Sequence, residues 1–224
     1  FVRAAAVSYE ESAPFFGDKA FVSGNPVRKG FFMAPDSQLS KSRRPRVLVV
    51  GGSQGAHAIN EAMMEAAPII ARVPGGIDVT HQTGEADVDI VRGAYRRAGI
   101  DAQVECFFDL MDEEMHAADL VVCRAGATTL SEVAAAGRPS LIVPFPHAAY
   151  DHQRSNAQVM VDAGSAALVD ETDLSTCFAN RLLDLIADRE RLQAMSQAAF
   201  RLARPNAAEA IVNRVTELLK LSTS

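Results

Sequence analysis

The sequence is poor in cysteine, and the three that it has, Cys106, Cys123 and Cys177, are odd in number and far apart. Two of them lie in the apolar runs VECFF and LVVC, where a reduced thiol packs as a small hydrophobic side chain. We therefore interpret the cysteines as core residues rather than metal ligands or nucleophiles. This use of cysteine indicates a reducing compartment such as the bacterial cytoplasm.

An excess of positive charge is also absent. The net charge is −6 and the acids are spread along the chain, which argues against a nucleic-acid-binding surface or a polybasic membrane anchor. No uninterrupted apolar run is long enough to span a bilayer, and the opening residues FVRAAAVSYEE lack the layout of a signal peptide. A chain of 224 residues is long for one average domain and short for two, so we expect one complete domain and a fragment of another.

Short apolar runs alternate with longer segments in which apolar residues recur at helical spacing, for example between Ala58 and Ile70. This alternation predicts parallel strands joined by right-handed crossovers, and so an α/β fold with a doubly wound, Rossmann-like sheet. The expected strands are 46–50, 77–81, 102–106, 119–123, 140–144 and 166–170.

The two ends of the chain do not fit this alternating unit. Residues 1–34 read as the tail of a preceding domain that is mostly missing, and the polar, proline-containing residues 35–45 read as a linker. The sheet domain is expected over 46–204, with the last helix in 205–224. The helical segments predicted after the last strand are 174–187, 188–203 and 206–220.

A glycine-rich turn, VLVVGGSQGAHAIN, follows the first expected strand and opens a helix. Such a turn presents backbone N–H groups to an anion. The dinucleotide fingerprint is not met, because Ser53 and Ala56 replace its later glycines, and a Walker loop is excluded because no lysine follows Gly55. A bound phosphate and a turn without a ligand both remain open.

The segment RAGATTLSEVAAAG offers a second anion site after the fourth strand of the sheet. Gly126 is expected to let the backbone turn sharply, and Thr128 and Thr129 open a helix whose first N–H groups lack intrahelical partners. Glu132, one turn further on, is suited to accepting hydrogen bonds from the two hydroxyls of a ribose. The alternative is a helix cap by Thr128 or Thr129 with Glu132 as its capping-box partner.

The loop PFPHAAYDHQRSNA follows the fifth strand and leads into another helix. Its side chains Asp151, His152, Gln153 and Asn156 can donate to or accept from sugar hydroxyls in fixed directions. Alternatively, Asp151 caps the helix. His147 and His152 are interpreted as hydrogen-bonding residues rather than general bases.

Other polar residues receive no site role. The acid pair in DVD, at Asp87 and Asp89, is assigned to charge pairing on a solvated helix face rather than to a metal. His57 and His116 lie in helical segments and are given no function. No metal or cofactor is predicted.

Several motifs together resemble the C-terminal half of the MurG family of bacterial peptidoglycan glycosyltransferases. These motifs are GNPVR (24–28), VGGSQGA (50–56), HQTG (81–84), the run CRAGATTLSEVAAAGRPSLIVPFP (123–146) and DHQ with NA (151–157). The resemblance implies the two-domain GT-B fold and transfer of N-acetylglucosamine from UDP-GlcNAc to a lipid-linked muramyl-pentapeptide. It also implies that residues 205–224 pack on the N-terminal domain.

The resemblance also implies roles for individual residues. Arg28, Ser53 and Gln54 would lie at the diphosphate, Phe108 would meet the uracil edge through its backbone, and Glu132 would hold the ribose. The helix start at Ala127, Thr128 and Thr129 would cradle phosphate, and His152, Gln153 and Asn156 would lie at the N-acetylglucosamine ring.

The implied reaction is an inverting displacement at the anomeric carbon. Its general base is expected in the missing N-terminal domain, so no catalytic residue is assigned here and the chain alone is expected to be inactive. The full protein is expected in the cytoplasm, peripheral on the inner face of the cell membrane, with no nucleic-acid partner. Alternatives are a UDP-sugar epimerase or a related transferase with another acceptor, a natural half-enzyme, and a non-catalytic UDP-sugar-binding subunit.

Overall fold

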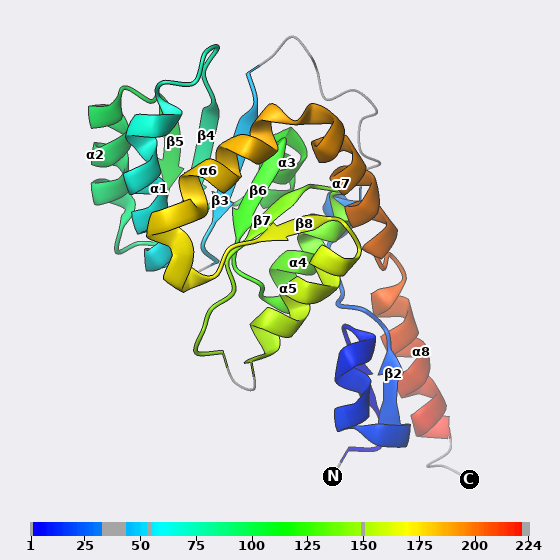
Figure 1. The fold of residues 1–224 in the computed structure, drawn as a ribbon. Helices are drawn as coiled ribbons and strands as arrows, with labels where there is room; N and C mark the ends of the chain where they lie inside the picture. The colour runs from blue at the N-terminus through cyan, green and yellow to red at the C-terminus, as the bar shows by residue number, and fades with distance from the viewer. Residues whose placement is uncertain (1, 33–43, 53–54, 149–150, 221–224) are drawn as a thin grey trace.

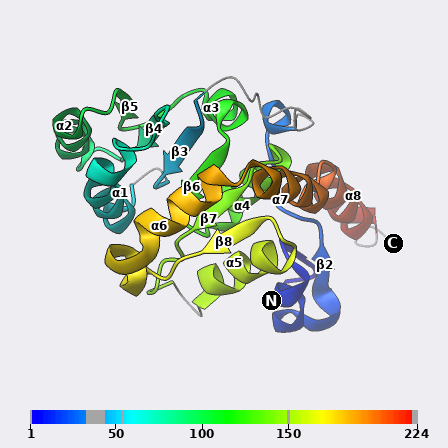
Figure 2. The ribbon, with the colours of Figure 1, turned by 45° about the horizontal axis from the view of Figure 1, so that its top comes forward.

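The computed structural model describes residues 2–32, 44–52, 55–148 and 151–220. The expected phosphate contacts Ser53 and Gln54, and most of the predicted linker, lie outside these residues. Figures 1 and 2 show one central sheet covered by helices, with a small N-terminal unit and the last helix extending from it.

The central sheet has six parallel strands in the order β5-β4-β3-β6-β7-β8. The chain begins in the middle at β3 and winds outward first to one side and then to the other, which confirms the predicted doubly wound fold. All six predicted strands are present. They are β3 (Arg46–Val50), β4 (Asp78–Gln82), β5 (Ala102–Glu105), β6 (Leu120–Cys123), β7 (Ser140–Ile142) and β8 (Ala166–Leu168).

The valine-rich strand β3 shows how the sequence builds two cores. Successive side chains of a strand point to opposite faces, so Val47 and Val49 pack in one hydrophobic cluster while Leu48 and Val50 pack in the other. All four are buried. A strand covered on both faces reads as a continuous apolar run, as this one does.

Helices cover both faces of the sheet (Figure 1). One cluster contains residues of α1, α2 and α6, and the other contains residues of α3, α4 and α5. The predicted helices at the end of the chain are confirmed. The helices are α1 (His57–Ile70), α2 (Val88–Ala98), α3 (Met111–Ala117), α4 (Ala127–Ala135), α5 (His152–Asp162), α6 (Leu174–Ala187), α7 (Arg189–Leu202) and α8 (Ala207–Lys220).

The N-terminal unit is a separate two-stranded parallel sheet of β1 (Ala5–Val7) and β2 (Ala20–Val22), with the 3₁₀ helices η1 (Glu10–Phe15) and η2 (Gly17–Lys19) between them. It lies beside α8 in both views (Figures 1 and 2). After β2, a Cβ atom on Gly24 would lie 2.6 Å from Cβ of Arg204, in the connection between α7 and α8.

The chain then attaches to the main domain through the 3₁₀ helix η3 (Lys29–Phe31). Phe31 is fully buried in the core cluster that includes α3, and His116 of α3 is hydrogen-bonded to the carbonyl oxygen of Gly30 at 2.8 Å. His116 thus fixes this attachment.

In the part of the chain that the structure describes, no helix is both long and apolar enough to cross a membrane.

Candidate functional site

Three helices begin at the carboxyl edge of the sheet without a side-chain cap. Helices α1, α4 and α5 start after Ala56, Gly126 and Asp151, and none of these residues accepts a hydrogen bond from the helix through its side chain. The first N–H groups of a helix lack intrahelical partners, and the helix dipole adds positive potential there. This edge of the sheet is therefore suited to an anion.

The starts of α1 and α4 open into one cavity of about 690 Å³. This volume falls within the range of small-molecule sites, roughly 300–1,000 Å³. The two helix starts expected to share a phosphate are thus neighbours. The described residues that line the cavity are Gly51, Gly52, Gly55, Ala56, His57, Ala58, Glu61, Arg124, Gly126, Thr129, Phe145, Gln153 and Glu171.

The turn before α1 depends on glycine for its shape. Gly52 and Gly55 have φ values of +80° and +78°, and a Cβ atom on Gly55 would lie 2.1 Å from the carbonyl oxygen of Thr83. Residues other than glycine rarely adopt such positive φ values. The turn therefore packs directly on the loop that follows β4.

Gln82, the last residue of β4, connects this turn to the loop after β5. Its Nε2 donates to the carbonyl oxygen of Gly52 at 3.1 Å, and its Oε1 accepts from the N–H of Phe108 at 3.0 Å. Gln82 is 2% exposed. It was not predicted as a site residue, and the available signal was a polar side chain ending an otherwise buried strand.

The predicted uracil contact, Phe108, is buried in the second core cluster. Its backbone N–H is already bonded to Gln82. The N–H of Phe108 therefore already has an acceptor and is not a free donor for a ligand.

The start of α4 differs from two expectations. Gly126 has φ −64° and ψ +135°, which any residue can adopt, so the expected sharp turn at this glycine is wrong. A Cβ atom there would have nothing closer than Oγ1 of Thr129 at 4.0 Å. The capping-box alternative is also wrong, because α4 begins at Ala127 and Glu132 lies beyond the first turn.

Glu132 is half-buried on α4, one turn after Thr128 and on the same flank. Burial raises the pKa of its carboxyl group, the positive charge of Arg28 opposes that rise, and the nearby Asp112 adds to it. The guanidinium of Arg28 lies over the ring of Phe31, 5.3 Å from its centroid. The structure thus brings Arg28 and Glu132 close enough to interact electrostatically.

The start of α5 holds the loop between β6 and α4 in place. Oε1 of Gln153 accepts from the N–H groups of Ala125 at 3.1 Å and Phe145 at 3.0 Å. Asn156, which is buried, donates from Nδ2 to the carbonyl oxygen of Ala125 at 3.1 Å. Gln153 lines the cavity, whereas Asn156 is outside the described lining.

His152 is exposed at the first position of α5. The preceding residue, Asp151, has φ +54° and makes no side-chain cap, so the alternative in which its carboxylate caps the helix is wrong. Asp is among the few side chains that tolerate this left-handed conformation.

A chain of buried polar groups lies behind the start of α1. The hydroxyl of Tyr95 lies 2.8 Å from Nδ1 of His81, whose Nε2 lies 2.9 Å from Oδ1 of Asn60. Nδ2 of Asn60 donates to Oδ2 of Asp87 at 2.7 Å, and the same oxygen lies 2.8 Å from Nδ1 of His57. Burial lowers the pKa of His81 to about 3, so this ring is neutral.

This network corrects two predictions. Asp87 is only 7% exposed and is not on a solvated helix face, although Asp89 is and pairs with Arg92 at 3.2 Å. His57, which was given no role, bonds to Asp87 and lines the cavity.

The cysteines have different surroundings. Cys123 is buried as expected, whereas Cys106 is exposed, so a core role for Cys106 is wrong. Within the described ranges, no group of three or more His, Cys, Asp or Glu side chains is arranged to hold a metal ion.

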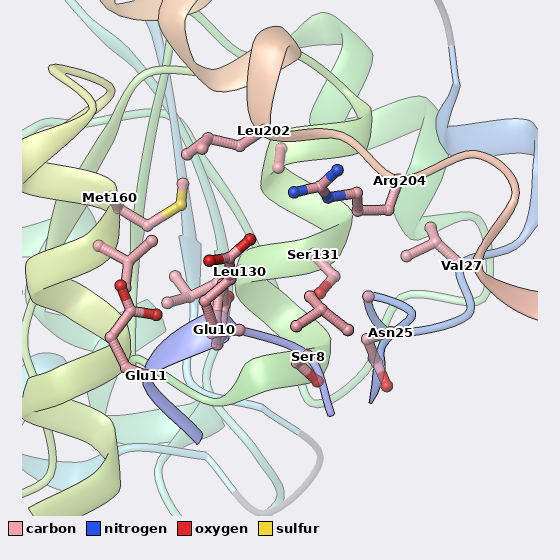
Figure 3. Close-up of a pocket in the computed structure, with 15 residues that line it drawn as sticks. Ser8, Glu10, Glu11, Asn25, Val27, Leu130, Ser131, Met160, Leu202 and Arg204 are labelled. Atoms are coloured by element: carbon pink, nitrogen blue, oxygen red, sulfur yellow. The ribbon is translucent and has the colours of Figure 1, made fainter. Parts of the chain in front are cut away.

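A second cavity, of about 230 Å³, lies between the N-terminal unit and the helices α4, α5 and α7 (Figure 3). Figure 3 shows Leu202 and Arg204 on one side of it and Glu10 and Glu11 on the other. It meets the flank of α4 at Leu130 rather than the free N–H groups at its start. The larger cavity at the strand ends is therefore the better candidate for an anionic ligand.

Comparisons with known proteins show the family to which the chain belongs. The model of the glycosyltransferase family 28 C-terminal domain matches residues 46–211. A Geobacter sulfurreducens protein named UDP-N-acetylglucosamine–N-acetylmuramyl-(pentapeptide) pyrophosphoryl-undecaprenol N-acetylglucosamine transferase is 43% identical over 214 residues, covering 93% of the chain and 59% of that relative. A protein of the same name from Anaeromyxobacter dehalogenans is 42% identical over 224 residues, covering 98% and 58%.

Solved structures give the same result. The crystal structure of MurG from Acinetobacter baumannii superposes with a TM-score of 0.80 at 29% identity, covering 96% of the chain and 61% of that structure. The chain spans less than two thirds of the length of the curated relatives described above. The resemblance to MurG and the predicted fold are confirmed. The chain belongs to glycosyltransferase family 28, and it contains the Rossmann-like C-terminal domain of a GT-B fold.

Proposed function

We propose that this chain is the nucleotide-sugar-binding half of an inverting glycosyltransferase. The reaction is transfer of N-acetylglucosamine from UDP-GlcNAc to N-acetylmuramyl-pentapeptide linked to undecaprenyl diphosphate, the activity named for its relatives. The observation that carries the proposal is the cavity shared by the uncapped starts of α1 and α4.

The diphosphate is the ligand group that fits these helix starts. Free N–H groups at Ala127, Thr128 and Thr129 supply donors from α4, and the first N–H groups of α1 supply donors from the other side. Ser53 and Gln54, which precede α1 in the sequence, are proposed as further phosphate contacts. The positive potential of two helix ends favours a doubly charged group more than a neutral one.

The nucleoside is assigned to the flank of α4 beyond the first turn. The carboxylate of Glu132 accepts hydrogen bonds from the ribose hydroxyls, and Arg28 balances its charge. Phe108 lies at the base, in the loop that Gln82 ties to the phosphate turn. The sugar is assigned to the start of α5, where His152 is exposed and Gln153 lines the cavity, while Asn156 holds the loop at Ala125.

Negative charge grows on the departing diphosphate as the acceptor hydroxyl attacks the anomeric carbon. Donors that are already positioned around that diphosphate bind the transition state more tightly than the ground state. No general base is assigned on this chain. The base, the lipid acceptor site and the contact with the inner face of the cell membrane are proposed to belong to the remainder of the full-length protein.

Calorimetric titration of the chain with UDP-GlcNAc and UDP tests the binding site. We expect both to bind and GDP to bind more weakly, because its purine differs from the uracil of the proposed substrate. A chain that is folded by circular dichroism and yet gives no heat with either uridine nucleotide would remove the proposed site.

A hybrid enzyme tests transfer. In it, this chain replaces the matching C-terminal part of the Geobacter sulfurreducens relative, to which it is 43% identical. The hybrid is expected to convert the lipid-linked acceptor to the disaccharide. A folded hybrid that binds UDP-GlcNAc without transfer would instead favour the alternative, a non-catalytic UDP-sugar-binding subunit.

A further inference from the structure

His57 differs from an ordinary surface histidine in being held in a fixed orientation. It is the first residue of α1 and lines the cavity that Gly126 and Thr129 of the second helix start also line. Its Nδ1 lies 2.8 Å from Oδ2 of Asp87. A carboxylate only accepts hydrogen bonds, so Nδ1 carries the hydrogen toward Asp87, and the other nitrogen, Nε2, lies 3.3 Å from Oε1 of the exposed Glu61.

The carboxylate that orients this ring is itself fixed from behind. Asp87 is 7% exposed and accepts from Nδ2 of Asn60 at 2.7 Å. Because Asn60 also donates to the carbonyl oxygen of Thr83 at 3.0 Å, its Oδ1 is the acceptor toward Nε2 of His81. A buried carboxylate whose Oδ2 is held by Asn60 fixes the orientation of the histidine ring that bonds to the same oxygen.

The charged groups around His57 favour its protonated form. The hydrogen bond to Asp87 and the charge of Asp87 raise the pKa of the imidazole, and Glu61, whose Oε1 lies 3.3 Å from Nε2, adds to the rise. The partial positive charge at the start of α1 acts in the opposite direction and disfavours protonation of His57. Across the cavity, Arg124 and Glu171 form an ion pair, so their charges balance.

We propose that His57, oriented by Asp87, is a cationic phosphate contact that donates a hydrogen bond from Nε2 to a diphosphate oxygen of the nucleotide sugar. This inference rests on the proposed function. Glu61, which is exposed, gives up its contact with Nε2 when the diphosphate enters. In the transferase reaction, the same hydrogen bond stabilises the negative charge that the leaving diphosphate gains.

The pH dependence of UDP-GlcNAc affinity tests the proposal. The diphosphate of this ligand is doubly esterified and stays ionised, so a change in affinity between about pH 6 and pH 9 reports protein groups such as histidine. We expect the dissociation constant to rise about five- to tenfold as His57 loses its proton, the effect of one charged hydrogen bond at a partly solvated position.

Two variants separate charge from structure. His57→Gln should bind UDP-GlcNAc about five- to tenfold more weakly at low pH and lose most of the pH dependence, whereas His57→Arg should retain tight binding at high pH. Uridine, which lacks phosphate, should bind all three proteins equally. His147→Gln is the matched control because this exposed histidine has no assigned role.

Nuclear magnetic resonance gives an independent readout. Titration of the His57 ring should show its pKa rising further when UDP-GlcNAc is bound. The proposal is overturned if His57→Gln binds with the affinity and pH profile of the unmodified chain, or if it loses uridine affinity to the same extent. If the unmodified chain binds no UDP-GlcNAc at all, the proposed function fails, and this inference fails with it.

Discussion

Replacing Gln82 by leucine should loosen the phosphate turn and the base loop together. The side chain of Gln82 joins Gly52 to Phe108 through two hydrogen bonds of 3.1 and 3.0 Å, and it is almost completely buried. Leucine fills a similar space but can make neither bond. Both loops then lose the partner that sets their separation.

The cost follows from the groups left without partners. The N–H of Phe108 is buried, and a buried donor without an acceptor costs about 1 to 3 kcal/mol. The carbonyl of Gly52 is only half-buried and can turn to water, so its loss costs about 0.5 to 1 kcal/mol. We expect the free energy of unfolding to fall by about 1.5 to 4 kcal/mol, and UDP affinity to fall by about tenfold, which is about 1.4 kcal/mol.

Urea denaturation gives the first quantity and calorimetric titration with UDP gives the second. Gln103→Leu, on an exposed position of β5, is the control and should change stability by less than about 0.5 kcal/mol. The reasoning is refuted if Gln82→Leu unfolds at the same urea concentration as the unmodified chain and binds UDP equally well.

Three further predictions concern the site and the buried network. Glu132→Gln should weaken UDP binding by about 1 to 3 kcal/mol at neutral pH because a charged acceptor is lost, and calorimetry with 2′-deoxy-UDP should show a smaller difference between the two proteins. Gly55→Ala should abolish UDP binding and destabilise the chain more than Gly99→Ala, because both glycines have positive φ but only Gly55 lacks room for a Cβ atom; equal thermal shifts for the two would contradict this. Burial lowers the pKa of His81 from its ordinary value of 6.5 to about 3 in the folded chain, so the unfolded chain binds more protons between these two pH values. Stability should therefore be fully present above pH 6.5 and fall by up to about 1.4 kcal/mol per pH unit below it; urea titrations of His81→Gln should show a shallower slope, and an unchanged slope would assign the effect to another group.

The fold followed from the sequence because its elements are specified locally. A parallel strand buried on both faces needs a continuous apolar run, and RVLVV supplies one without reference to distant residues. The same holds for α6, whose observed bounds, Leu174–Ala187, match the predicted segment. Cys106 shows where local prediction of burial fails. It follows β5, the edge strand of the sheet, and it is exposed. The position of a strand at the edge of a sheet is set by the order of all the strands and cannot be read from the local sequence.

The site was less predictable because its contacts join residues that are far apart in the chain. The positions after strands could be recognised as a shared edge, and the lining of the cavity confirms that α1 and α4 open side by side. The burial of Asp87, however, depends on Asn60, 27 positions earlier. The role of Gln82 depends on two loops whose conformations no local pattern encodes.

The open starts of α1, α4 and α5 have a consequence for the empty protein. Without a substrate, water must hydrate these amide groups, and each water molecule can serve only the helix that it touches. One phosphate shared between helices replaces several such waters and ties the helices to a common point. Substrate arrival should therefore rigidify this edge of the sheet as one unit, and product departure should return it to independent, hydrated parts.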